Sequence, residues 1–191
     1  NLGNAYNIIG DYTKGKDLVE QGLKIAREIQ NPALESKGLN GLASIYKSRN
    51  NYQKGLELTQ QSLQIAQKQK SPPLLIYPQF SLGSIYSSLG DYQKSRYYYQ
   101  QGLKTSQKLK NRSSEGIALL NLASTHFSQG NPQKTVELSQ QALTIFQEIK
   151  VPSLQAFAHR MLSLGYGDLG NDTDAMKSAQ KFLEFSRKVE N

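Results

Sequence analysis

The sequence predicts an all-helical protein built from repeats, and two observations carry this prediction. First, the chain of 191 residues repeats its pattern every 40 residues without an insertion or deletion. Second, each repeat contains two stretches in which apolar residues recur three or four positions apart, the spacing that places them on one helix face. No helix pair can bury such a face alone, so neighbouring repeats are expected to stack around a continuous core.

The 40-residue period holds for apolar, small and turn-forming residues alike. Each unit has a leucine followed by a small residue, then a Tyr or His, then a Gly or Asn, and at once an Asp or Asn. In three successive units these residues are Leu42, Ala43, Tyr46, Asn50 and Asn51; Leu82, Gly83, Tyr86, Gly90 and Asp91; and Leu122, Ala123, His126, Gly130 and Asn131. Agreement at this many positions cannot arise by chance.

The turn residues predict where each helix ends and the next begins. The Gly or Asn adopts the left-handed conformation that closes a first helix. The Asp or Asn after it is a preferred N-cap, so a second helix is expected to start there. In one unit Pro132 follows Asn131 directly, and proline suits the first helical position. The second helix then runs for about eighteen residues and ends near a stop signal such as Ser71-Pro72.

Small residues recur on both helices of the unit, which predicts close approach of neighbouring helices. Because a helix with Gly, Ala or Ser at the contact can pack nearer to its neighbour, these positions should be buried at helix–helix contacts. They are Gly3, Ala43, Gly83 and Ala123 on the first helices, and Gly22, Ser62, Gly102 and Ala142 on the second.

The motif Leu82-Gly83…Tyr86…Gly90-Asp91-Tyr92 resembles the core signature of the tetratricopeptide repeat, without its usual tryptophan. The resemblance implies an all-α, right-handed superhelical solenoid of antiparallel helix pairs. Units of 40 residues, longer than the common length of about 34, are similar to those of Pins/LGN-type adaptors and of bacterial signalling arrays. The chain begins without Met inside a helical pattern, so we interpret it as part of a larger protein. The expected organisation is one array over 1–191, with a truncated unit at 1–31 and full units at 32–71, 72–111, 112–151 and 152–191.

The resemblance also implies a protein-interaction scaffold whose first helices line a concave groove for a peptide or helical segment. At 100° per residue, the side of a first helix opposite Leu39 and Leu42 faces this groove. The predicted groove residues are Lys37, Asn40, Ser44, Lys47, Tyr77, Phe80, Ser84, Ile117, Leu120, Asn121, Ser124, Phe157 and Arg160. Solvent-facing positions rarely carry so many apolar residues without a partner. The alternative is that the helices pack part of this apolar ridge internally.

The net charge of +8 supports a second functional hypothesis. Residues 40–112 contain eleven Lys or Arg and two acids, so they carry +9 and the rest of the chain −1. A basic region attracts nucleic acid or another anionic partner, and Tyr97, expected to be exposed beside Arg96, could stack on a base. Most of these cations fall near helix C-termini, where they complement the helix dipole. We therefore favour a protein partner over nucleic acid.

The sequence carries no recognisable catalytic or metal-binding pattern, so neither an enzyme nor a cofactor is expected. The chain has no cysteine, and its two histidines, His126 and His159, are interpreted as packed side chains. Asp168, Asp172 and Asp174 gather at a turn where acids favour a helix start. No stretch approaches the roughly 20 apolar residues that span a bilayer, and the expected location is the cytoplasm.

The ends of the array do not resemble the polar caps that repeat proteins need. Phe182 stands where the other units have a small residue, and Phe185 lies close to it in the sequence. Self-association through the array ends is therefore expected, unless these ends pack against other parts of a larger protein.

Overall fold

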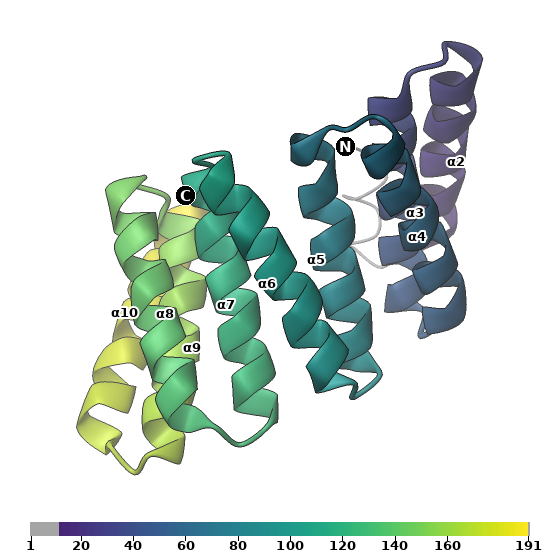
Figure 1. Ribbon diagram of the computed structural model, residues 1–191. Coiled ribbons are helices and arrows are strands. Elements are labelled where there is room, and N and C mark those ends of the chain that lie inside the picture. Colours follow the sequence, from purple (N-terminus) through teal and green to yellow (C-terminus); the bar gives the residue numbers. More distant parts are fainter. Residues whose placement is uncertain (1–11, 191) are drawn as a thin grey trace. The chain divides into compact units, whose positions relative to one another are not determined.

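The computed structural model describes residues 12–190, and the helices that these residues form are shown in Figure 1. Within this range there are nine helices and no strand, which confirms the all-α fold class. The helices are α2 (Tyr12–Glu28), α3 (Pro32–Ser48), α4 (Tyr52–Lys68), α5 (Pro72–Ser88), α6 (Tyr92–Lys108), α7 (Arg112–Ser128), α8 (Pro132–Glu148), α9 (Pro152–Asp168) and α10 (Asp172–Glu190). The predicted positions Leu2 and Gly3 lie outside the described residues.

Successive helices begin twenty residues apart throughout this range, because every turn has the same construction. One residue in each turn has a positive φ, which places it in the left-handed region. These residues are Gln30, Asn50, Lys70, Gly90, Lys110, Gly130, Lys150 and Gly170. The sequence predicted this conformation at the Gly and Asn positions. It did not predict it for the Gln and Lys residues of the alternate turns.

The residue after the left-handed one serves two helices at once. The main-chain N–H of Asn111 donates to the carbonyl of Ser106 in α6 over 2.9 Å. The Asn111 side-chain Oδ1 accepts a hydrogen bond from the N–H of Ser114 in α7 over 3.0 Å. Asn51 and Asn131 make the same pair of contacts. The predicted N-caps are therefore confirmed, and each also helps to end the helix before it.

The described helices group into two compact units, which divide between Tyr98 and Tyr99 within α6. In the first unit α2 packs on α3, α3 on α4, and α5 on both α3 and α4. In the second unit α7 packs on α8, and α9 packs on α7, α8 and α10. The single array and its unit boundaries stay a prediction.

Small residues allow the close packing that the sequence predicted, except at Gly22, which is exposed and has no neighbour within 4 Å of a Cβ placed there. In the first unit the fully buried Ala43 and Ser62 lie at helix contacts, and the Ser62 hydroxyl lies 2.7 Å from that of Ser36. In the second unit a Cβ at Gly116 would lie 2.4 Å from the ring of Phe146, which is itself fully buried. The core of the first unit consists of Val19, Leu23, Leu39, Leu42, Ala43, Ile45 and Leu58.

The last helix packs on α9 through a pair of rings and leaves apolar residues exposed. His159 of α9 stacks on Phe185 of α10, with the ring centroids 5.7 Å apart. Met176 and Leu183 of α10 are 64% and 52% exposed, and Phe182 is half-buried. Self-association through this end stays a prediction. No helix in residues 12–190 combines the length and apolar character needed to cross a membrane.

Replacing Lys110 by Gly should stabilise the protein. The exposed Lys110 holds a φ of +53°, which costs an L-residue about 1 kcal/mol and costs Gly nothing comparable. Lys104→Gly, at an exposed position inside α6, is the matched control and should destabilise by about 1 kcal/mol. Urea unfolding followed by circular dichroism measures both changes. Equal losses of stability in the two variants would contradict the role assigned to this turn.

His159 should make the stability of the second unit depend on pH. Burial, with a smaller effect of Lys181, lowers the pKa of His159 below its ordinary value of 6.5. As the pH falls through the unfolded-state value, the unfolded chain binds the proton first, so the free energy of unfolding decreases. The melting temperature should therefore fall more between about pH 7.5 and 5.5 in the parent protein than in His159→Phe. Equal falls would exclude this contribution.

Candidate functional site

The first helices of the predicted units each have a buried side and an open side. In α3, Leu39 and Leu42 are buried in the core, whereas Lys37 and Ser44 are exposed on the other side. The same division holds in α5, α7 and α9. Gly41 is an exception, since its angular position on α3 belongs to the open side but it is buried. It has no side chain to keep α5 away from α3, and α5 packs against α3 here.

In the first unit, α3 and α5 enclose a pocket of about 630 Å³, which we call the first pocket. Tyr77 stands at its edge with 70% of its side chain exposed. Leu34, Pro73 and Leu74 supply apolar surface, and Lys37 is the charged side chain in the lining. The complete lining is Ala33, Leu34, Ser36, Lys37, Asn40, Gly41, Ser44, Pro73, Leu74, Tyr77 and Ser81.

Polar side chains connect the wall of the first pocket to the helix behind it. The Asn40 amide donates to the carbonyl of Ser36 over 2.9 Å and to the hydroxyl of Ser62 in α4 over 2.5 Å. The Oδ1 atom of Asn40 is buried and accepts no hydrogen bond from residues 12–190.

Lys47 joins the two helices further along the same face. Its Nζ donates to the hydroxyl of Ser84 in α5 over 2.6 Å. Burial lowers the pKa of Lys47, because α3 and α5 remove water from around the ammonium group. Both residues were predicted as groove residues, but neither lines the first pocket.

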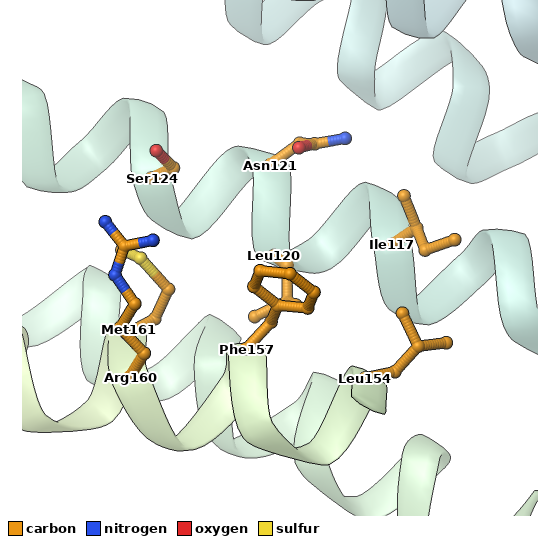
Figure 2. A pocket seen from close by; sticks show the side chains of 8 residues that line it. All are labelled: Ile117, Leu120, Asn121, Ser124, Leu154, Phe157, Arg160 and Met161. Carbon is orange, nitrogen blue, oxygen red and sulfur yellow. The ribbon is translucent and has the colours of Figure 1, made fainter. Parts of the chain in front are cut away.

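In the second unit, α7 and α9 enclose a pocket of about 320 Å³, the second pocket. Figure 2 shows Ile117 and Leu120 of α7 facing Leu154 and Phe157 of α9. Phe157 is 53% exposed. The remaining lining residues are Asn121, Ser124, Arg160 and Met161. Apolar side chains therefore form most of the wall, and Arg160 is its charged member.

The two pockets occupy the same place in the repeat, because their corresponding residues lie 80 positions apart. Tyr77 corresponds to Phe157, and both are exposed aromatic side chains at the edge of a pocket. Several other pairs also line both pockets: Lys37 and Ile117, Asn40 and Leu120, Gly41 and Asn121, Ser44 and Ser124, Leu74 and Leu154, and Ser81 and Met161. The geometry recurs, while two polar side chains of the α3 wall, Lys37 and Asn40, are replaced by the apolar Ile117 and Leu120 in α7.

The predicted groove residues differ in how far they reach into solvent. Tyr77 and Phe157 are exposed, but Phe80, Ile117 and Leu120 are half-buried. The alternative of internal packing therefore accounts for part of the apolar ridge. Sequence reasoning missed three leucines, although they recur at one position of the 40-residue period, where the fourth unit has Ser114 instead: Leu34, Leu74 and Leu154. The binding role of all these residues stays a prediction.

Within residues 12–190, no group of three or more His, Asp and Glu side chains gathers in a way that could hold a metal ion. His159 is half-buried against Phe185, on the side of α9 that faces α10. The pockets themselves contain hydroxyls, amides and single cations, a combination that suits recognition of a ligand by shape and hydrogen bonds.

Several solved structures share this fold. BtubC (BKLC) from P. vanneervenii is 19% identical with a TM-score of 0.80, and the match covers 100% of this chain and 79% of that one. A Rap protein complexed with Competence and Sporulation Factor is 14% identical with a TM-score of 0.89, covering 99% and 53%. A signal transduction ATPase from Pyrococcus horikoshii with a tetratricopeptide repeat sensor is 21% identical with a TM-score of 0.77, covering 100% and 30%. At these identities the similarity shows the fold alone.

No curated protein matches the sequence. Two family models do, both described as tetratricopeptide repeat: one matches residues 34–108 and the other residues 117–149. The matched segments include α4, α5, α6 and α8 whole and most of α3 and α7. They therefore cover both helices of the first pocket and one helix of the second, α7. With the recurring helix pairs and turns described above, these matches show that the chain belongs to the tetratricopeptide repeat family.

Proposed function

We propose that this chain is a protein-interaction module that acts by binding, and that its two pockets hold side chains of a partner protein's peptide or helical segment. One observation carries the proposal: each unit leaves an aromatic side chain exposed at the edge of a pocket, at the same place in the repeat. These are Tyr77 in the first pocket and Phe157 in the second.

An exposed aromatic ring beside a pocket offers a partner a large apolar contact surface. A buried aromatic side chain removes roughly 150–250 Å² of surface from water, and aromatic residues dominate the binding energy of many interfaces. Tyr77 and Phe157 stand beside apolar surface from Leu74 and Leu154, one helical turn earlier. A partner side chain inserted there would contact the ring and the leucine together.

Similar structures lend the proposal general support. The Rap protein was solved in complex with Competence and Sporulation Factor, and the Pyrococcus horikoshii protein is described as using its repeats as a sensor. Arrays of this fold are thus used for recognition in other proteins. The ligand of this chain must follow from its own pocket residues, because the same fold serves many ligands.

The rival hypothesis is binding of nucleic acid through the basic middle of the chain. Tyr97 favours it, since this side chain is 55% exposed and lies edge-on to Tyr98. Against it, several of the cations already have acidic partners: Lys54 pairs with Glu57, Lys94 with Asp91, and Arg112 with Glu115 and Glu148. Lys68 and Lys108 lie in the last turns of their helices, where the helix dipole accounts for them.

A pull-down with matched serine variants separates the two hypotheses. The purified chain is incubated with nuclease-treated lysate of the source cells at low and high salt. Phe157→Ser and Tyr77→Ser should each reduce recovery of a specific protein roughly tenfold or more, as loss of a central aromatic contact does. Tyr97→Ser should leave recovery unchanged, because its side chain is as exposed as that of Phe157 but lies outside both pockets.

Melting temperatures of the three variants serve as the folding control, and all should stay close to that of the parent. Recovery that disappears with nuclease, falls steeply with salt and depends on Tyr97 would contradict the proposal and support nucleic-acid binding. Recovery that is unaffected by both Phe157→Ser and Tyr77→Ser would exclude the pockets as binding sites.

A further inference from the structure

Each pocket contains one cation in its lining and no carboxylate. Arg160 is the charged lining residue of the second pocket, and Lys37 is that of the first. Both side chains are exposed. Figure 2 shows Arg160 extending from α9 beside Met161, on the side of the pocket where Ser124 lies. A ligand that fills the second pocket therefore passes next to a guanidinium group.

Arg160 differs from the other arginine near α7 in having no acidic partner. Arg112 forms ion pairs with Glu115 over 2.7 Å and with Glu148. No carboxylate of residues 12–190 lies within ion-pair distance of Arg160. Asp168, the acid on the same helix, is eight residues away, which corresponds to about 12 Å along the axis. The charge of Arg160 is thus available to a ligand.

The first pocket also has one cation, Lys37, but on its other wall: Lys37 corresponds to Ile117 in the repeat, whereas Arg160 corresponds to Phe80. The Lys37 ammonium forms no ion pair with the described acids, while Glu35, the acid two residues earlier, is paired with Arg27 over 2.8 Å. Lys47 adds a second cation on the same face, and its ammonium contacts the neutral hydroxyl of Ser84. Both pockets therefore offer an exposed cation in their lining, although at different places in the repeat.

We propose that the bound segments are acidic. In the second pocket the preferred segment inserts an aliphatic or aromatic side chain between Ile117 and Phe157 and carries an Asp or Glu within one helical turn of it. Its carboxylate accepts hydrogen bonds from Arg160. This inference rests on the proposed function and specifies the chemistry of the partner.

The spacing follows from the positions of the two groups on α9. Phe157 and Arg160 are three residues apart, so their main-chain positions differ by about 4.5 Å along the helix. One turn of a bound helix, or one to two residues of an extended segment, spans the same distance. The apolar anchor and the acid must therefore be close neighbours in the partner's sequence.

A carboxylate suits this site better than a phosphate group. The planar guanidinium matches a carboxylate through two parallel hydrogen bonds. A phosphate group carries about two charges and is usually held by several cations or main-chain N–H groups. The second pocket supplies the single cation of Arg160, which lies about two turns from the main-chain N–H groups at the N-terminus of α9.

Selection from a phage-displayed library of random 15-residue peptides tests the inference. The intact chain is immobilised, and selection is repeated with Phe157→Ser, Arg160→Gln and Arg160→Glu. Peptides that require Phe157 should carry Asp or Glu within four residues of an apolar residue. Synthetic versions should bind Arg160→Gln roughly fivefold to tenfold more weakly, and exchanging the peptide acid for its amide should cost the same. Arg160→Glu should select Lys or Arg at that position.

Lys104→Gln is the matched control, because it removes one exposed positive charge outside both pockets and should leave peptide affinity unchanged. Peptides that require Phe157 but show no preference for acids, and bind Arg160→Gln as tightly as the parent, would overturn the inference and leave the proposed function standing. A selection that yields no peptide dependent on Phe157 would contradict the proposed function itself at the second pocket.

Discussion

The spacing of twenty residues between successive helix starts is the constraint on which the rest of the structure depends. It exists because one turn residue takes a left-handed conformation and the next residue both ends one helix and caps the following one. At Asn111 a single side chain and its own N–H make both contacts. With no additional linker residues, every helix reverses direction at once and meets its neighbour in the same register. Positions with buried side chains and positions with exposed side chains then recur at a fixed interval in the sequence.

Small residues at the helix contacts allow neighbouring helices to pack closely. This packing on one side of each helix determines which side chains stay exposed on its other side. Gly116 lets α7 approach the buried ring of Phe146, and Gly165 has Val136 close to it in the same way. On the sides that face away from these contacts, α7 and α9 leave a space between them, and this space is the second pocket. The first unit repeats this in α3 and α5. The scaffold fixes the place of each pocket, whereas the residues at 37, 40, 117, 120 and 160 determine the chemistry of its wall.

The sequence predicted the helices and their caps well, because these depend on local chemistry that the 40-residue period displays repeatedly, as at Asn51 and Asn131. Lys110 shows where local reasoning fails: lysine has no preference for a left-handed φ and adopts it because Asn111 must serve two helices. Exposure in the pockets was also only partly predictable. The angular position of a residue on one helix shows whether its side chain faces away from the core. It does not show how closely the first helix of the following unit approaches that side chain. For that reason Gly41 is buried and Ile117 half-buried, whereas Tyr77 and Phe157 remain exposed.

Photo-crosslinking from the second pocket tests the central claim most directly. The photoreactive residue p-benzoylphenylalanine is introduced in place of Phe157 and, as a control of equal exposure, in place of Tyr97. After irradiation in lysate of the source cells, mass spectrometry identifies the attached segments. Binding through the pocket predicts a recurrent protein segment with an apolar residue at the crosslink to position 157, and none at position 97. Crosslinks confined to position 97, or nucleic acid attached at both positions, would contradict it.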